Sequence, residues 1–455
     1  MIDPEGRRLP IKVDSTSNGE FAPVPLPPAS VAGNAAALEA ATRNAKRLGM
    51  TRRAFLVSSC GAASTLLAFN AANAAAGRSG GFFDVPREAA LDLELARAQV
   101  GPAKDEFILD VQGHFIARPD GNPKNAEVFL KDVFLDSDTD VMVLSFVPST
   151  REREPVTIEE ADAVRRLVER LEGTHRLLLH GRVNPNQPGD VESMAELKEK
   201  WNVSAWKTYT QWGPDGKGFF LHDDAGIRFI ERARAVGVKT ICIHKGLPFG
   251  SRSYEHSQCS DIGIVAKRFP DVNFLVYHSG FVSSVKEEAY REGKDGIDTL
   301  VTSLLKNDVK PGSNVYAELG STWRFLMRDP EQAAHGLGKL IRHCGPDNVL
   351  WGTDSIWYGA PQDQIQAFRT FQISPQLRSA HGYPEITPAL RAKIFGRNAA
   401  RVYGLSPQEV KRYTRTDRVA GEKQAYQENP DPHFRTWGPR TQREFLAFRK
   451  LHGAP

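Results

Sequence analysis

The chain has 455 residues, of which 40% are hydrophobic and 25% charged, and its formal net charge is +4. This length exceeds one average domain, and the ordinary hydrophobic content excludes a mostly disordered or collagen-like chain. Residues 54–455 carry 51 basic and 50 acidic side chains, so we expect no nucleic-acid partner. The four cysteines form no C-x-x-C pair, which argues against a disulfide framework or a thiolate zinc site.

The N-terminal region has the features of an export signal. Thr51-Arg52-Arg53-Ala54-Phe55-Leu56 leads into an uncharged run from Ala54 to Gly77, which includes Ala72-Asn73-Ala74, an A-x-A cleavage pattern. An arginine pair followed by x-Phe-Leu is typical of a twin-arginine signal, which exports folded proteins. We therefore predict a flexible N-region and signal over 1–76, export to the periplasm or the extracellular space, and no stable membrane insertion after signal removal. The alternative is a short apolar helix that happens to follow two arginines.

Eight short apolar or β-branched runs recur through the body of the chain. They are Phe107–Phe115, Val141–Pro148, His175–Val183, Val203–Thr210, Val238–Lys245, Asn273–Gly280, Asn314–Thr322 and Asn348–Ser355. Helical periodicity between them covers Ile158–Glu172, Ala225–Val236, Ser260–Phe269 and Gln332–His343. This alternation predicts an α/β fold, a (β/α)8 TIM barrel over 77–405. A doubly wound open sheet is the alternative, but the glycine-rich phosphate motifs typical of that fold do not follow the first strand.

The residues after Leu405 are polar and charged. Val410–Arg418 and Gln424–Pro432 precede a closing segment, Trp437–Phe448. We predict that 406–455 is a C-terminal helical extension that wraps the barrel or contributes to a homodimer. A partly disordered tail is the alternative.

Polar side chains collect near the C-terminal ends of the predicted strands, where TIM barrels carry their chemistry. In chain order they are Gln112, His114, Ser145, His180, Lys207, His244, His278, Glu318 and Asp354. Imidazoles and a carboxylate together suit a borderline divalent cation, and a converging set is stronger evidence than any single histidine. We therefore expect a divalent metal, with Zn²⁺ as the first choice and Mn²⁺ as the alternative.

Two local features sharpen this expectation. Gln112 and His114 are two residues apart on one predicted strand, so both side chains point to the same face. Asp354, at the end of the last strand, can bind a metal and accept a proton from water. A further histidine near the water or the substrate can transfer protons, because its ordinary pKa lies in the working range.

The order of the motifs resembles the amidohydrolase superfamily, and in particular the amidohydrolase-related branch of metal-dependent hydrolases and nonoxidative decarboxylases. The motifs are LDVQGH at 109–114, IHKG at 243–246, VYHSG at 276–280, LWGTD at 350–354 and a closing-helix motif at 394–405. The resemblance covers about residues 105–405. It implies that His114, His244 and Asp354 bind the metal, and that His278 is a proton shuttle, a substrate-polarising group or a further ligand.

Gln112 departs from that family pattern, in which this position is usually histidine, or glutamate in some decarboxylases. A glutamine offers only a neutral carbonyl oxygen, which is a weaker donor. Three hypotheses follow: a weaker site with Gln112 as a ligand, a site of three protein ligands plus water, or a lost metal.

Three further side chains are candidates for substrate binding. Lys207 either binds an anionic substrate or pairs with Glu318, and a carbamylated metal-bridging lysine is the sharper alternative that other branches of the superfamily suggest. Glu318 is itself a candidate substrate group. Trp351 and other tryptophans near the strand ends either form the floor of an apolar or aromatic pocket or pack in the core.

We expect an enzyme that acts on a small molecule, and three functions compete. The leading hypothesis is a hydrolase that cleaves an amide, lactone or other ester with metal-activated water, Asp354 taking the proton and His278 steadying the developing charge. The second is a nonoxidative decarboxylase, a carboxy-lyase of an aromatic or unsaturated acid. The third is a non-catalytic periplasmic small-molecule binder, for which Gln112 is the only support.

Overall fold

The computed structural model describes residues 3–114, 124–170, 174–248 and 254–451. Eight parallel strands form one sheet in sequence order. They are β2 (Leu109–Gly113), β3 (Val141–Leu144), β4 (Leu177–Arg182), β5 (Ala205–Tyr209), β6 (Thr240–His244), β7 (Asn273–Tyr277), β8 (Val315–Glu318) and β9 (Val349–Leu350). Each lies within one of the eight predicted runs. Phe115 of the first run, and Leu171 and Glu172 at the end of the predicted helix Ile158–Glu172, fall outside the described residues.

The two edge strands of this sheet meet and close it. Gly113 and Ser355 form a parallel bridge, and the amide of Asp354 donates to the carbonyl of Gln112 at 2.9 Å. The predicted TIM barrel is therefore confirmed, and the open doubly wound sheet is excluded.

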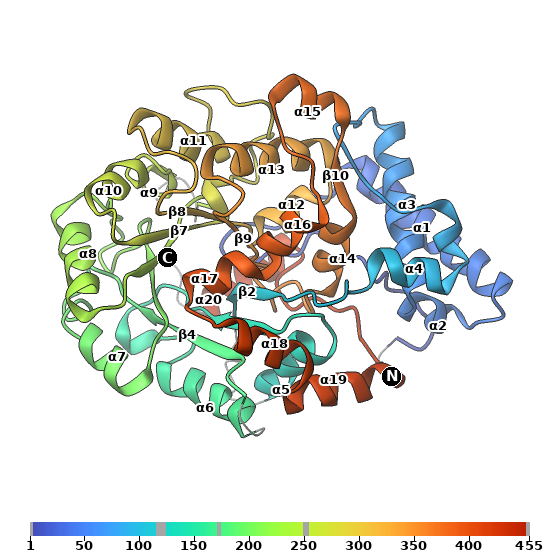
Figure 1. Cartoon of the computed structure of the whole chain (residues 1–455), viewed down its shortest axis with the longest axis horizontal. Coiled ribbons are helices and arrows are strands. Elements are labelled where there is room, and N and C mark those ends of the chain that lie inside the picture. The colour runs from blue at the N-terminus through green and yellow to red at the C-terminus, as the bar shows by residue number, and fades with distance from the viewer. Residues whose placement is uncertain (1–2, 115–123, 171–173, 249–253, 452–455) are drawn as a thin grey trace.

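A ring of helices surrounds the strands (Figure 1). It includes α5 (Lys124–Leu130), α6 (Ile158–Glu169), α7 (Met194–Trp201), α8 (Asp224–Val236), α9 (Tyr254–Ser257), α10 (Ile262–Arg268), α11 (Ile297–Lys306), α12 (Thr322–Leu326), α13 (Pro330–Cys344) and α14 (Gln362–Thr370). Local sequence sets several of their ends. Thr157 and Glu160 form a capping box at the start of α6. Gly237 ends α8 at φ +85°, a conformation that glycine adopts without strain.

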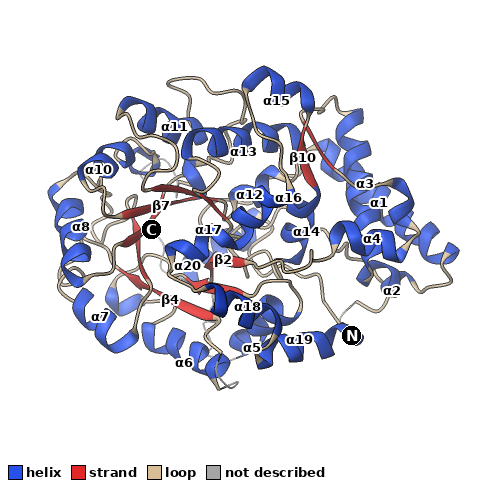
Figure 2. Cartoon of the chain, viewed as in Figure 1, coloured by secondary structure: helices blue, strands red, loops and turns tan. Residues whose placement is uncertain are grey.

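The first 76 residues, for which the sequence predicts flexibility, contain helices in the structure. They are α1 (Pro28–Arg47), α2 (Arg52–Val57) and α3 (Ser59–Ala75), which lie to one side of the barrel with α4 (Leu93–Val100) in Figure 2. The buried face of α1 repeats alanine every four residues, at Ala37, Ala41 and Ala45. Such small side chains let two helices approach closely. Because alanine is only weakly hydrophobic, the sequence shows little of the periodic pattern that predicts an amphipathic helix. Among the described residues, no helix combines the length and apolarity needed to cross a bilayer.

Both ends of the chain fold back onto the barrel. A two-stranded sheet joins β1 (Gly81–Phe83) to β10 (Phe371–Ile373). The C-terminal part contains α15 (Pro375–His381), α16 (Pro388–Ala392), α17 (Asn398–Val402), α18 (Pro407–Arg415), α19 (Arg418–Glu428) and α20 (Gln442–Leu451). The stretch between α19 and α20 reaches the loop after β9, because the amide of Trp437 donates to the carbonyl of Trp357 at 2.8 Å. The described part of the C-terminal extension therefore contacts the barrel.

Candidate active site

Strand ends bring the predicted metal-site residues together inside the barrel mouth. Gln112 and His114 come from β2, His244 from β6, and His278 and Asp354 from the residues just after β7 and β9. All five are at most 3% exposed. His278 and Asp354 have positive φ angles, +62° and +59°. Residues other than glycine adopt a positive φ at some cost in free energy, and residues strained in this way cluster at functional sites.

Asp354 is the most heavily hydrogen-bonded side chain of the site. His114 Nε2 lies 2.9 Å from its Oδ1, and Gln112 Nε2 donates to the same oxygen at 3.1 Å. The other oxygen, Oδ2, accepts from Ser321 Oγ at 2.5 Å. Burial opposes ionisation of this carboxyl, but the hydrogen bond and charge of His114, with those of its neighbours, hold the pKa of Asp354 well below its usual range. The carboxyl group is therefore ionised.

Gln112 occupies the centre of the group. Its Nε2 lies 3.5 Å from His114 Nε2 and 3.4 Å from His278 Nε2. Its Oε1 is buried and has no hydrogen-bond partner among the described residues. A half-turn of the Gln112 amide group would exchange its Nε2 and Oε1, so that the carbonyl oxygen faced His114, His278 and Asp354.

Two glycines make room for Gln112 and Glu318. A Cβ on Gly320 would overlap the oxygen atoms of both side chains, and one on Gly352 would overlap Glu318 Oε1. Glu318 Oε2 accepts from the amide of His278 at 3.0 Å, and its Oε1 accepts from the amide of Gly320 at 2.6 Å. Burial raises the pKa of Glu318 to about 8 in spite of these bonds. Glu318 thus fixes the backbone that carries His278.

The tautomer of His278 follows from its contacts. Nδ1 lies 2.6 Å from the carbonyl of Gly320, which can only accept, so Nδ1 carries the hydrogen. The other ring nitrogen, Nε2, therefore presents a lone pair to the centre of the site. Burial lowers the pKa of His278 to about 4 and that of His244 well below its usual value. Both imidazoles are neutral, the form in which histidine binds a metal or accepts a proton.

Lys207 lies in the barrel interior on β5. Its Nζ sits 3.8 Å from the ring centroid of Tyr277 and 4.8 Å from that of Tyr209. The side chain is fully buried, and no hydrogen-bond acceptor for Nζ exists among the described residues. The predicted pair with Glu318 is therefore not formed. Burial lowers the pKa of Lys207 to about 8.

Asp110 holds the first and last strands in register at the site. Its Oδ1 accepts from the amides of Gln112 at 3.0 Å and Thr353 at 3.1 Å. Its Oδ2 accepts from the Thr353 hydroxyl. One buried carboxylate thus positions the residues next to both Gln112 and Asp354, which gives a structural reason for an aspartate in the LDVQGH motif.

Two residues from the N-terminal region escaped sequence reasoning, as Ser321 did. Asn18 Nδ2 donates to Asp354 Oδ2 at 2.8 Å, and Glu20 Oε1 lies 3.5 Å from His244 Nδ1. Burial and the charge of Asp354 raise the pKa of Glu20 well above its usual value. The sequence holds no signal for this placement, because both residues lie more than 300 positions before Asp354 and upstream of the predicted export signal.

Trp351 and His180 lie outside this group. The indole of Trp351 packs against Phe368 and Phe395, with ring centroids 5.1 and 5.0 Å apart. Strand alternation explains this position, since Leu350 faces the barrel interior and the next side chain faces the helices. The structure thus corrects the expectation that Trp351 lines a substrate pocket. His180 instead lies 3.2 Å from the hydroxyl of Tyr403 in the closing helix.

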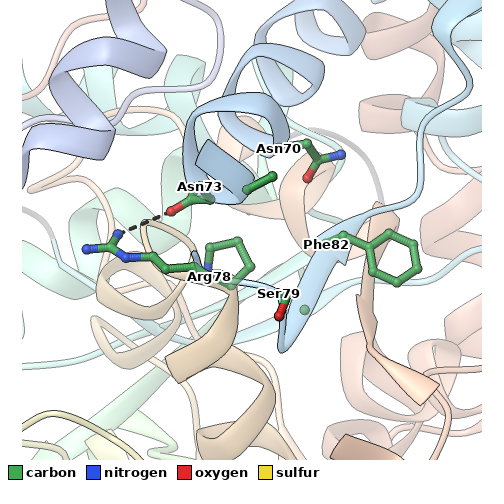
Figure 3. Close-up of a pocket in the computed structure, with 8 residues that line it drawn as sticks. Asn70, Asn73, Arg78, Ser79 and Phe82 are labelled. Atoms are coloured by element: carbon green, nitrogen blue, oxygen red, sulfur yellow. Dashed lines mark hydrogen bonds between the residues drawn. The ribbon is translucent and has the colours of Figure 1, made fainter. Parts of the chain in front are cut away.

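A separate surface pocket of about 270 Å³ lies at the end of α3. Figure 3 shows Arg78 and Asn73 bonded to each other on one side of it, with Phe82 on the other side. The Arg78–Asn73 hydrogen bond is 3.1 Å long, and Arg78 is the one charged residue in the lining. This pocket has no acid–base pair, so the strand-end group is the candidate active site.

The chain was also compared with known proteins. No curated protein matches the chain. Similar solved structures include an amidohydrolase from Burkholderia multivorans with bound zinc, at 15% identity over 66% of this chain and 100% of the other, with a TM-score of 0.43. A 2,6-dihydroxybenzoate decarboxylase from Rhizobium matches at 15% identity over 67% and 99%, with a TM-score of 0.40. A putative 2-pyrone-4,6-dicarboxylic acid hydrolase from Pseudomonas putida matches at 15% identity over 66% and 97%, with a TM-score of 0.39.

The family assignment comes from a direct match of the sequence. Residues 109–405 match the family model described as Amidohydrolase. The match spans well over half of the chain and contains all the strands that carry the site. The protein therefore belongs to the amidohydrolase family.

Proposed function

We propose that the protein is a metal-dependent hydrolase that cleaves an amide, lactone or other ester bond in a small molecule. One observation carries the proposal: neutral imidazoles and an ionised carboxylate converge from separate strand ends on one buried centre. Family membership and this convergence support an enzyme more strongly than a silent barrel. The proposal extends to an anionic substrate, because Lys207 is a buried cation without a hydrogen-bond acceptor among the described residues.

The donor set fits a divalent cation. His114, His244 and Asp354 would hold it, with His278 and the carbonyl of Gln112 in reach. Oε1 of Gln112 is buried without a hydrogen-bond partner among the described residues. A half-turn of the amide would bring this acceptor to the centre, where a cation would use it. Nitrogen and oxygen donors of this kind suit Zn²⁺ first and Mn²⁺ second. Such an ion supplies Lewis acidity and lowers the pKa of water to about 7.

The residues of the chain would divide the remaining work between them. His278 Nε2 presents a lone pair because its Nδ1 is committed to Gly320, so it can accept a proton. Asp354 offers a second acceptor, positioned by donors on both oxygens. Lys207 can bind a carboxylate of the substrate at the floor of the mouth.

A substrate screen on metal-analysed protein tests this proposal. The purified chain is first assayed for zinc and manganese, then given lactones, esters and amides that carry a carboxylate, and acid release is followed. We expect activity that chelation abolishes and re-addition of metal restores. Activity that survives complete metal removal would contradict the proposal.

Decarboxylation is the second candidate, because Lys207 could equally hold the carboxylate of an aromatic acid. An ammonium group seated on the rings of Tyr209 and Tyr277 suits an aromatic acid as well as an aliphatic one. The same screen decides between the two, with hydroxylated aromatic acids as substrates and CO₂ as the product. Release of CO₂ without hydrolysis of any ester or amide would favour the lyase.

Export is a separate proposal that rests on the sequence around Arg52 and Arg53. In the folded chain Arg53 is 5% exposed and pairs with Asp431 at 3.2 Å. A transport receptor would therefore have to bind the pair before α2 docks. Fractionation of cells that express the wild type or a double lysine variant tests it, and equal distribution of both proteins would contradict it.

A further inference from the structure

The segment 9–21, called here the N-terminal arm, lies at the barrel mouth and is anchored on two sides. Arg324, fully buried after β8, donates to Asp14 Oδ1 at 2.9 Å. On the other side, the amide of Ser17 donates to the carbonyl of Pro439 at 2.8 Å. The arm is thus fixed to the barrel and to the C-terminal extension at once.

The arm ends in a tight turn at Asn18-Gly19-Glu20. Asn18 Oδ1 accepts from the amide of Glu20 at 3.0 Å, which closes the turn. Gly19 has φ +85°, a conformation that glycine adopts without strain. Asn18 Nδ2 donates to Glu20 Oε2 at 2.6 Å and to Asp354 Oδ2 at 2.8 Å. One amide therefore holds the two carboxylates side by side.

Glu20 faces the imidazoles of the site. One ligand atom each from Glu20, His244 and His278 lies within 4.8 Å of the others. The Glu20 side chain is 9% exposed and that of His244 is fully buried. Ligands bound to zinc at about 2.0–2.2 Å in a tetrahedron lie about 3.4 Å apart. The group is therefore close to the size that encloses one ion.

The charges of the carboxylates at this centre also favour a bound cation. Among the described barrel residues, Asp354 is the one carboxylate that contacts the side chains of both His114 and Gln112, because position 112 is a glutamine. Two buried carboxylates beside each other repel, and leaving them without a counter-ion is costly. When both are ionised, as metal ligands are, the Glu20 and Asp354 side chains carry the charge that balances one divalent cation.

We infer that Glu20 is a metal ligand, supplied to the barrel by the N-terminal arm in place of the anionic donor that Gln112 does not provide. The inference rests on the proposed metal-dependent function. It also requires that the chain keep residues 1–76, since cleavage after Ala74 would remove Glu20.

Metal affinity of the full-length protein tests the inference. Glu20→Gln keeps the shape of the side chain and removes its charge. Glu39→Gln is the matched control, because Glu39 lies on α1 with 73% of its side chain exposed. Dissociation constants for Zn²⁺ and Mn²⁺ are measured by competition with a chromophoric chelator, and the visible spectrum of the Co²⁺ form reports the ligand set. We expect Glu20→Gln to bind at least about tenfold more weakly with an altered Co²⁺ spectrum, and Glu39→Gln to match the wild type.

A carboxylate-retaining variant guards against a folding artefact. Glu20→Asp should keep more affinity than Glu20→Gln, while the metal-free proteins unfold at similar temperatures. Wild-type affinity and an unchanged Co²⁺ spectrum in Glu20→Gln would overturn the inference. That result would also be expected if Glu20 only occupied the position of a substrate carboxylate. A wild-type protein that binds no metal would overturn both the inference and the proposed function, whereas a failed substrate screen with normal metal data would affect only the function.

Discussion

The barrel and the N-terminal arm contribute to one site by different means. In the barrel, parallel strands carry His244 and Asp354 to the same edge, so the geometry follows from the fold itself. The arm has no strand to place Glu20. It is held at the site by the bond from Arg324 to Asp14 and by the bond from the Ser17 amide to the carbonyl of Pro439. A barrel motif can therefore be read from spacing, whereas a donor delivered by a chain end depends on tertiary contacts that spacing does not encode.

Removing a barrel donor should have the largest effect. Asp354→Asn and His244→Ala are each expected to lower kcat by about 10³-fold, because each removes a metal ligand and the first also removes a proton acceptor. The metal-free variants should retain the circular dichroism spectrum of the wild type. Turnover within about tenfold of the wild type in either variant would remove that residue from the mechanism.

Lys207 tests whether the floor of the mouth binds an anion. Lys207→Met should raise KM for a carboxylate-bearing substrate by about 10–100-fold, the value of one charged hydrogen bond. The fold should not lose stability, since Nζ makes no hydrogen bond to the described residues. Lys200→Met, whose side chain is 57% exposed on α7, is the control. Equal KM values for the two variants would show that Lys207 does not bind substrate.

Gln112 tests how far the barrel depends on the arm. Gln112→His should tighten metal binding by about tenfold, because imidazole is a stronger donor than an amide oxygen. In that background Glu20→Gln should cost less affinity than it does in the wild type. An affinity unchanged by Gln112→His would mean that residue 112 does not contact the metal.

The smallest effect is expected from loosening the arm without touching the site. Asp14→Asn removes the charged acceptor of Arg324 and should cost about 1–2 kcal/mol in the free energy of unfolding. Metal affinity should fall only a few-fold, and the arm should become the first site of limited proteolysis. A proteolysis pattern identical to that of the wild type would show that this ion pair does not hold the arm.

These contrasts match what the sequence could and could not predict. The strands were predictable because β-branched runs and periodic helices alternate, as at Val141–Leu144 and Ile158–Glu169. The convergence of His114, His244 and Asp354 followed from strand ends. The direction in which the Trp351 side chain points could not be predicted in this way, since a shift of one residue along a strand moves a side chain to the opposite face.

The N-terminal region was harder to predict for a physical reason. The alanine-rich face of α1 packs closely but carries a weak hydrophobic signal, so the helix over 28–47 was not expected. The arm then depends on single long-range bonds, such as Arg324 to Asp14. The export signal stays a prediction, because its motif overlaps helices whose packing says nothing about transport.

The most direct test is a crystal structure of the metal-loaded full-length chain with data collected at the absorption edge of the bound metal. We expect one anomalous peak per chain, within about 2.0–2.2 Å of a nitrogen of His244 and an oxygen of Asp354, with Glu20 in the same coordination shell. A peak bound by other residues, or no peak at this centre, would contradict it.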